Sequence, residues 1–314
     1  MNSLEQLKNH STVVADTGDF GLLERYKVQD ATTNPSLILK AARMPEYAPL
    51  VRDTVRRFRK EEPGEVVDRI LVRIGCEILQ RVPGRVSTEV DARLSFDAGA
   101  TVDRGMRIVD MYRAEGVNPD RVLVKIAATW EGIQAARVLQ QRGIRTNLTL
   151  LFSLCQAIAC ADANVQLISP FVGRIYDWYK NRAGANWVQS DSEGGNDPGV
   201  RSVREVHAYF KRFDVQTEIM GASFRNIGQI IALAGCDLLT ISPELLEQLA
   251  VSELSVVRVL DGSGSQAPNE PIAYAEQAFR STLAQNVMAS EKLTEGIASF
   301  SSDTQKLEEL IAST

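Results

Sequence analysis

The chain has 314 residues, a formal net charge of -5, four cysteines and two histidines. A weakly acidic chain without a Lys/Arg run suits neither nucleic acid nor an anionic membrane, so we expect neither partner. The cysteines, Cys76, Cys155, Cys160 and Cys236, lack C-x-x-C spacing and disulfide-scaffold density, which favours a reducing, cytoplasmic setting. We identify no signal-peptide pattern and no run as long as a membrane span.

The histidines limit the possible chemistry. His10 and His207 have no H-x-x-H or H-E-x-x-H partner, which argues against a zinc site and a His-based triad. The chain also lacks G-x-x-x-x-G-K-[ST] and G-x-G-x-x-G loops, so nothing indicates a nucleotide. We therefore expect no metal centre and no nucleotide.

Short β-branched runs alternate with helix-period stretches along the chain. The predicted strands are Thr12 to Asp16, Asp30 to Thr33, Val86 to Glu89, Val122 to Ile126, Arg145 to Leu150, Gln166 to Ser169, Thr217 to Gly221 and Leu238 to Ile241. Helical patterns lie between them, including Val102 to Glu115, Ile133 to Arg142, Val203 to Phe213 and Ile227 to Leu233.

This alternation predicts an α/β fold of about eight βα units, which favours a single (β/α)8 TIM barrel with additional N- and C-terminal helices. An open doubly wound sheet is the alternative, although its phosphate-loop signature is missing. We expect one domain over residues 1–314, with the barrel at about 11–258 and a C-terminal helical extension at about 268–314.

Three segments lie outside the βα alternation. Arg182 to Gly199 reads as a surface loop and Asp261 to Pro271 as a linker. Beyond the linker, Phe279, Leu283 and Val287 recur at helical spacing, while Ser302 and Gln305 resemble a capping box that would begin a last helix through Leu307, Leu310 and Ile311.

One lysine, Lys125, interrupts the apolar run V-L-V-K-I-A from Val122. Taken alone, the run favours an edge strand whose lysine points outward or reaches into water. Burial offers another role, because desolvation and nearby cations can lower a lysine pKa by about 3 to 5 units and free the amine for Schiff-base chemistry.

Polar residues at the ends of the other strands change that balance. The active site of a TIM barrel lies at the C-terminal ends of its strands, where a set of polar residues is more informative than any one of them. For a single residue, a turn or a helix cap is the better interpretation. The set comprises Asp16, Thr33, Asn34, Glu89, Lys125, Asn147, Thr149, Ser169 and Ser223.

Together these side chains suit carbon–carbon bond chemistry on a polyol ketone. Lys125 would add to the carbonyl, and the protonated imine would accept electrons when the neighbouring bond breaks. Glu89 and Asp16 would supply the acid and base steps if their surroundings separate their pKa values. Arg174 and Arg225, shortly after the sixth and seventh strands, favour a phosphate on the sugar, although each alone reads as a solvated surface arginine.

Long motifs around these residues resemble transaldolase of the pentose phosphate pathway, in its larger form. They cover most of Leu4 to Ser255 in the expected order. The matching stretches are V-V-A-D-T-G-D from Val13, Q-D-A-T-T-N-P-S-L-I-L-K-A-A from Gln29, V-P-G-R-V-S-T-E-V-D-A-R-L-S from Val82, T-N-L-T-L-L-F-S from Thr146, L-I-S-P-F-V-G-R-I-Y-D-W-Y-K from Leu167 and M-G-A-S-F-R-N-I-G from Met220.

The resemblance implies a class I aldolase barrel in which Lys125 forms a Schiff base with sedoheptulose 7-phosphate or fructose 6-phosphate. Asp16 would take the hydroxyl proton during cleavage, and Glu89 with Thr149 would hold the water of imine formation and hydrolysis. The remaining residues would bind substrate. These are Asn34, Asn147 and Ser169 for the dihydroxyacetone unit, with Thr33 and Phe171 in the same set, and Arg174, Ser223 and Arg225 for the phosphate.

The dihydroxyacetone unit would pass to glyceraldehyde 3-phosphate or erythrose 4-phosphate, without metal or cofactor. The resemblance fades after Leu260, which leaves acceptor access and the choice between monomer and homodimer open. One alternative is a fructose 6-phosphate aldolase that releases free dihydroxyacetone, although such enzymes are shorter and carry Tyr at the position of Phe171. Another is a non-catalytic sugar-phosphate-binding barrel.

Overall fold

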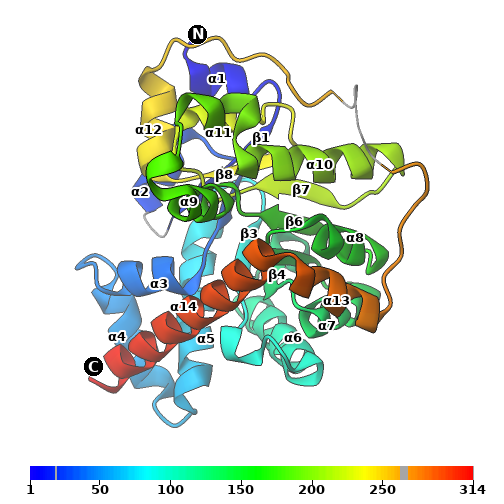
Figure 1. Ribbon diagram of the computed structural model, residues 1–314. Coiled ribbons are helices and arrows are strands. Elements are labelled where there is room, and N and C mark those ends of the chain that lie inside the picture. Colours follow the sequence, from blue (N-terminus) through cyan, green and yellow to red (C-terminus); the bar gives the residue numbers. More distant parts are fainter. Residues whose placement is uncertain (18–19, 262–267, 314) are drawn as a thin grey trace.

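A computed structural model describes residues 1–17, 20–261 and 268–313 of the chain (Figure 1). Within these residues, eight parallel strands form a closed barrel in chain order, with β1 hydrogen-bonded to β8. The predicted TIM barrel is therefore confirmed and the open sheet is wrong. The strands are β1 Thr12–Asp16, β2 Asp30–Thr32, β3 Val86–Glu89, β4 Val122–Ala127, β5 Thr146–Leu151, β6 Leu167–Pro170, β7 Glu218–Gly221 and β8 Leu238–Ile241.

Helices surround the barrel, and several begin at side-chain caps. Asn34 caps α3 by accepting from the amide of Leu37, and Asp97 caps α6 in the same way through Ala100. The helices are α1 Ser3–Leu7, α2 Phe20–Tyr26, α3 Pro35–Ala42, α4 Ala48–Phe58, α5 Pro63–Leu79, α6 Ala98–Ala114, α7 Trp130–Gln141, α8 Leu154–Asp162, α9 Val172–Ala183, α10 Pro198–Arg212, α11 Ile227–Ile231, α12 Pro243–Val251, α13 Glu276–Gln285 and α14 Val287–Ala312.

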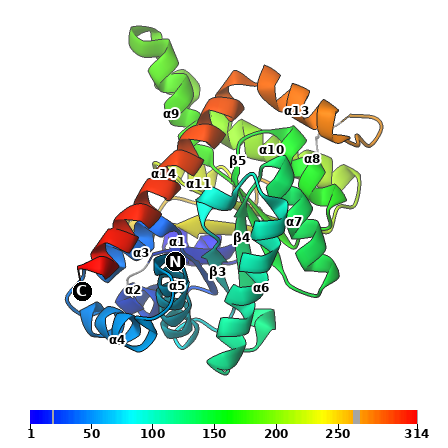
Figure 2. The same cartoon turned by 90° about the horizontal axis from the view of Figure 1, so that it is seen from below.

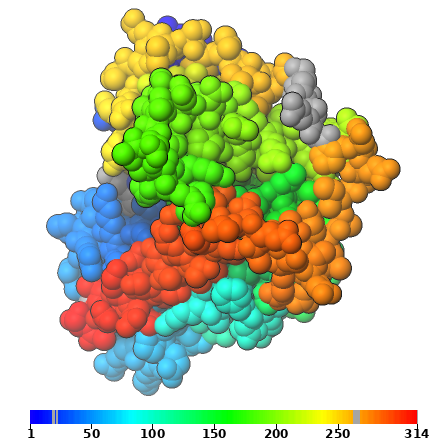
Figure 3. All heavy atoms as spheres, viewed as in Figure 1, coloured from blue at the N-terminus to red at the C-terminus, as the bar shows by residue number. Residues whose placement is uncertain are grey.

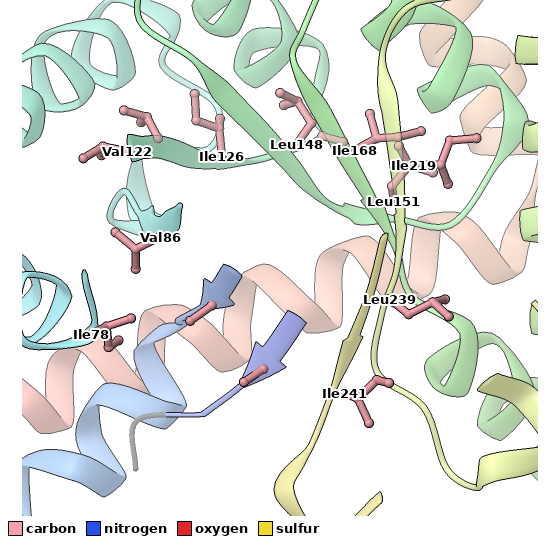
Figure 4. Close-up of a cluster of buried hydrophobic side chains, with 14 of the residues drawn as sticks. Ile78, Val86, Val122, Ile126, Leu148, Leu151, Ile168, Ile219, Leu239 and Ile241 are labelled. Carbon is pink, nitrogen blue, oxygen red and sulfur yellow. The ribbon is translucent and has the colours of Figure 1, made fainter. Parts of the chain in front are cut away.

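The outer face of the barrel is apolar. Because side chains alternate along a strand, every second residue points toward the surrounding helices. Figure 4 shows this layer, in which Val122, Ile126, Leu148 and Ile168 project away from the barrel interior. Each of these four side chains is at most 1% exposed, so the strands are anchored from outside and their inner residues are held in fixed positions.

The barrel interior is layered from floor to mouth. At the floor, Arg85 pairs with Asp30 of β2 at 2.9 Å and with Glu218 of β7 at 2.7 Å. Next comes a separate apolar cluster of Val14, Leu123, Leu167, Met220 and Leu238. Two residues further along β1, β4, β6 and β8 the inner side chain is polar, which places a polar layer at the C-terminal ends of these strands, whereas β7 is followed there by Ala222.

Helix α14 crosses the C-terminal end of the barrel. It contacts α3, α5, α9 and β5, and also a short 3-10 turn, η1 (Ala92–Leu94). Figures 1 and 2 show one long helix running from α13 toward α3, and in Figure 3 its side chains form much of the surface on this side of the molecule.

The predicted organisation of the C-terminal helices is wrong in two places. Ser302 begins no helix, because the buried stripe of α14 continues past it from Phe300 to Leu307. Val287 does not share a helix with Phe279, because the chain turns at Asn286, whose side chain caps α14 through the amide of Ala289. The local capping pattern at Ser302 is overridden by the packing of a continuous helix on the barrel.

The other segments match more closely. Two turns of the predicted surface loop, Ser190–Ser192 and Gly194–Asn196, are short 3-10 helices between α9 and α10. Residues 262–267 of the predicted linker lie outside the described residues. In the part of the chain that the structure describes, no helix combines the length and the apolar character needed to cross a membrane.

Candidate active site

Lys125 lies inside the barrel and its side chain is 5% exposed. Strand β4 pairs with β3 on one side and β5 on the other, so the interpretation of an edge strand with an outward lysine is wrong. The amine donates to the carbonyl of Thr33 at 3.1 Å. It also lies 3.2 Å from Oε2 of Glu89, its direct neighbour in the β3–β4 register.

Glu89 and Thr149 present unpaired oxygens to the interior of the barrel. The Lys125 amine approaches Glu89 Oε2 as an ion pair but not along a hydrogen-bonding direction. Among the described residues, Oε2 of Glu89 and Oγ1 of Thr149 are both buried without a hydrogen-bond partner. An unsatisfied buried acceptor costs about 1–3 kcal/mol, so two of them on β3 and β5, the strands that flank β4, point to a functional site.

Burial dominates the protonation of Glu89. It raises the pKa of the carboxyl, and the nearby charge of Asp16 adds to the rise. Lys125 and, more weakly, Arg174 act in the opposite direction without cancelling it. A carboxyl with a raised pKa exchanges protons more readily near neutral pH than a solvated one.

Asp16 approaches the same centre from β1. Its carboxylate accepts from Thr32 Oγ1 at 3.0 Å, and Thr32 in turn lies 2.8 Å from the hydroxyl of Thr240. Desolvation raises the pKa of Asp16, while Lys125, the Thr32 hydrogen bond and Arg174 each lower it in part. The two carboxyls therefore share one cationic environment.

A chain of hydrogen bonds joins the neighbouring strands below Lys125. Ser169 donates to Oδ1 of Asn147 at 2.7 Å, and Nδ2 of Asn147 donates to Oγ of Ser87 at 3.0 Å. Thr33 donates to the Ser87 carbonyl at 2.9 Å. Asn147 stands next to Lys125 in the β4–β5 register, so its orientation is fixed beside the amine.

Two predicted substrate residues have evident structural tasks. Asn34 uses its side-chain oxygen to cap α3, which is the ordinary role of a strand-end Asn. Phe171 packs edge-to-face on Phe152, with ring centroids 5.8 Å apart, and is 7% exposed. Both lie at strand ends of the barrel mouth, Asn34 shortly after β2 and Phe171 directly after β6.

The two arginines lie at the first turn of α9 and after β7. Arg174 stacks over the ring of Phe171 at 4.9 Å and over Phe300 of α14 at 5.4 Å. Burial and the charge of Arg225 lower the pKa of Arg174, while Glu89 and Asp16 raise it, so this cation belongs to the same electrostatic centre.

Arg225 is the more exposed of the two arginines. It binds Asp177 through Nε at 3.0 Å and Nη2 at 2.7 Å, and Nη1 lies 3.4 Å from Oγ of Ser223. Ser223 has a positive φ of 61°. Gly173 is needed at the start of α9, because a Cβ there would lie 2.1 Å from the Ser223 carbonyl oxygen. This close approach brings Ser223, Arg174 and Arg225 to one edge of the mouth.

The structure thus brings Lys125, Glu89 and Asp16 into one electrostatic centre, with Thr149 at the adjacent strand end and the arginines at the rim. Sequence reasoning missed the hydroxyls of Thr32, Ser87 and Thr240, which are at most 4% exposed. Ser87 could have been found, because it lies two residues before Glu89 and so shares its face of β3. Within the described ranges, no group of three or more His, Cys, Asp or Glu residues is arranged to hold a metal ion.

Comparisons with known proteins identify the family of the chain. Residues 13–311 match the family described as "Transaldolase/Fructose-6-phosphate aldolase". A protein named "Transaldolase" from Methylibium petroleiphilum (strain ATCC BAA-1232 / LMG 22953 / PM1) is 58% identical over 311 residues, covering 99% of this chain and 98% of that protein. The chain therefore belongs to the transaldolase and fructose-6-phosphate aldolase family.

Proposed function

We propose that the protein is a transaldolase that moves a dihydroxyacetone unit between sugar phosphates through a Schiff base on Lys125. Its donor is sedoheptulose 7-phosphate and its acceptor glyceraldehyde 3-phosphate, giving erythrose 4-phosphate and fructose 6-phosphate. The observation that carries the proposal is the buried Lys125 amine 3.2 Å from a carboxyl oxygen that has no hydrogen-bond partner. The 58% identical relative named transaldolase supports the choice of reaction.

The first steps form the imine. The Lys125 amine adds to C2 of the ketose, and the carbinolamine loses its C2 hydroxyl as water to give a protonated imine. Glu89 passes protons to and from that hydroxyl, and Thr149 orients the departing water. The unpaired Glu89 Oε2 and Thr149 Oγ1 suit this role, because a bridging water would satisfy both oxygens.

Cleavage follows at the C3–C4 bond. Asp16 removes the proton of the C4 hydroxyl, a C4 carbonyl forms, and the electrons of the broken bond move into the imine to give an enamine. The aldehyde product leaves while the enamine stays on Lys125. Addition of the enamine to the acceptor aldehyde and hydrolysis of the new imine reverse these steps.

Substrate recognition uses the polar layer and the rim. Asn147 and Ser169 are assigned to the hydroxyls of the dihydroxyacetone unit, with Thr33, Asn34 and Phe171 around it. Arg174, Arg225 and Ser223 are assigned to the phosphate. Support comes from fork-shaped guanidinium groups, which bind phosphate in a bidentate manner, and from the position of Arg174 in the first turn of α9, where the helix dipole favours an anion.

The chemistry as proposed needs no metal or cofactor, since the imine itself accepts the electrons. We assign the enzyme to the cytoplasm. The four cysteines are free, as is usual for proteins of a reducing compartment.

The test is reductive trapping with borohydride in the presence of fructose 6-phosphate. Peptide mapping should find the adduct on Lys125, and Lys125→Arg should lower turnover by more than about 10³-fold, because a guanidinium cannot form the imine. Lys8→Arg is the matched control. The side chain of Lys8 is only 22% exposed and pairs with Glu5, and Lys8 lies shortly before the N-terminal end of β1. An adduct on another lysine would refute the assignment.

A second measurement separates transfer from simple cleavage. Product formation is followed with and without an acceptor aldehyde, using erythrose 4-phosphate with fructose 6-phosphate. A transaldolase should release little dihydroxyacetone without the acceptor. Release at the full transfer rate would instead identify a fructose 6-phosphate aldolase, and tight sugar-phosphate binding without carbon exchange would identify a non-catalytic barrel.

A further inference from the structure

A glutamine with no assigned role joins the ends of the strands that carry Lys125 and Thr149. Gln156 lies in α8 and is 0% exposed. Its Nε2 donates to the carbonyls of Ala128 at 2.9 Å and Leu150 at 3.1 Å. Its Oε1 accepts from the amide of Phe152 at 2.9 Å and from the hydroxyl of Ser153 at 3.0 Å. The carboxamide thus uses both donors and both acceptor positions.

The backbone that Gln156 holds is irregular. The pairing of β5 with β6 shifts register between Leu148 and Leu151, and Leu150 has a φ of 53°. A left-handed leucine is strained and persists only where its surroundings hold it. Leu150 follows Thr149 directly, so this strained turn fixes the direction of the Thr149 side chain.

The same contacts join β5 to β4. Ala128, three residues after Lys125, donates its amide to the Thr149 carbonyl at 2.8 Å and offers its own carbonyl to Gln156. Gln156 therefore connects the end of β4, the strand of Lys125, with the end of β5, the strand of Thr149.

We propose that Gln156 is a positioning residue that keeps the Thr149 hydroxyl aligned with Lys125 and Glu89 for proton transfer through water. This inference rests on the proposed function, because it assumes that imine formation occurs at Lys125. It adds a residue of α8, outside the barrel mouth, to the machinery that sets the rate of that step.

Only a carboxamide can donate two hydrogen bonds and accept two hydrogen bonds at this position. A carboxylate could still accept from Phe152 and Ser153, but its second oxygen would face the carbonyls of Ala128 and Leu150 with no proton to donate. A protonated carboxyl regains one donor. A titratable side chain near Gln156 is Cys155, whose sulfur lies 3.2 Å from Ser153 Oγ. Burial raises the pKa of its thiol and also the pKa of Tyr274, which interacts with Cys155, so both stay neutral near pH 7.

The experiment compares Gln156→Glu with the full-length wild type. We expect kcat to fall about 10- to 100-fold, as for a reacting group displaced by about 1 Å, while KM for fructose 6-phosphate changes less than about threefold. Single-turnover borohydride trapping should show slower imine formation by the same factor. The ratio of variant to wild-type kcat should rise as pH falls, because protonation of the introduced carboxyl restores a donor.

Gln140→Glu is the matched control. Gln140 bonds the other end of β5, accepting from the Thr146 amide at 2.8 Å and donating to the Asn164 carbonyl at 2.8 Å. This change should lower the melting temperature without changing the rate of imine formation or the pH dependence of the kcat ratio. Ser153→Ala, which removes one donor to Gln156, should lower kcat about two- to fivefold and covers the case in which Gln156→Glu does not fold.

The outcomes are distinguishable. The inference is overturned if both Gln156→Glu and Ser153→Ala keep wild-type kcat, if Gln140→Glu slows imine formation equally, or if the kcat ratio does not depend on pH. In each of these cases the wild type would still exchange carbon between sugars and the proposed function would stand. Absence of a Lys125 adduct in the wild type would instead refute the proposed function.

Discussion

At the scale of single residues, the site keeps two carboxyls in a buried place where their ionised forms are costly. Burial raises the pKa of both Asp16 and Glu89. A folded-state pKa above the unfolded value favours folding at low pH, and this contribution is lost as pH rises through the raised pKa. At neutral pH the two carboxyls therefore lower stability, while their raised pKa values suit proton transfer.

Replacing Arg174 by Gln should move the acid limb of the kcat/KM profile to higher pH. The charge of Arg174 lowers the pKa of both Asp16 and Glu89, so its removal raises both values and leaves more of the base protonated at a given pH. KM for fructose 6-phosphate should also rise about 10- to 100-fold through lost charge-assisted hydrogen bonds to phosphate. The measurement is the pH dependence of kcat/KM.

Arg225→Gln provides the comparison. Arg225 is not among the principal charges acting on Asp16 or Glu89, and it is held outside the centre by Asp177. This variant should raise KM without moving the acid limb. If both variants shift the limb equally, Arg174 has no special part in tuning the carboxyls.

At the scale of elements, α14 depends on a glycine to approach the barrel. A Cβ at Gly296 would lie 2.6 Å from Cδ2 of Leu150 and 3.2 Å from Nη1 of Arg174. Leu150 is 0% exposed and its backbone is fixed in the left-handed region, so it has little freedom to yield. The helix therefore packs closely on both the strained end of β5 and Arg174.

Gly296→Ala should lower the free energy of unfolding by about 1–3 kcal/mol through overpacking, and raise KM for fructose 6-phosphate by displacing Arg174. Urea unfolding and steady-state kinetics measure the two effects. Gly99→Ala in α6 is the control, since a Cβ there meets only Asp97 Oδ1 at 3.5 Å, and it should be neutral or stabilising by up to about 1 kcal/mol. A Gly296 variant indistinguishable from this control would contradict the tight contact.

The elements also show how far the sequence determines the structure. The predicted bounds of β1, β3 and β8 match the observed strands, because short apolar runs between turn residues are local signals. The expected C-terminal helices are present but their predicted bounds are wrong, because α14 begins at the Asn286 cap and its packing on the barrel carries it past Ser302. In the site, the strand-end rule found Lys125 and Glu89, whereas Gln156 gave no signal beyond one polar residue in the apolar run L-C-Q-A-I-A of α8.

At the scale of the whole molecule, the barrel is closed at both ends by different means. An ion network around Arg85 closes the floor, joining β2 to β7 across the barrel. Asp30, the partner in β2, has a side chain only 8% exposed, and this arginine is its ion-pair partner. The mouth is covered by the apolar face of α14, including Leu293 and Phe300. The residues that close the floor are thus different from the residues that surround the candidate site at the mouth.

Arg85→Met should therefore destabilise the protein without harming catalysis. Removing one partner of a buried ion pair costs about 3–5 kcal/mol, because the remaining charge is left uncompensated. We expect a loss of that order in urea unfolding, with kcat within about twofold of wild type since the site lies at the other end of the barrel. Arg113→Met removes an exposed pair with Asp110, 52% and 63% exposed, and should cost less than about 1 kcal/mol. Equal losses in the two variants would show that the floor network does not stabilise the barrel.

The position of α14 after the barrel strands in the chain determines when the barrel mouth is covered during synthesis. Synthesis runs from the N-terminus, so the barrel strands emerge before the helix that covers their C-terminal ends. Until α14 leaves the ribosome, the apolar residues that it covers, such as Leu150 and Phe171, remain open to solvent and to other nascent chains. The barrel mouth is therefore covered only after Val287–Ala312 has been synthesised, and a polypeptide that stops short of Val287 would expose this apolar surface to chaperones and proteases.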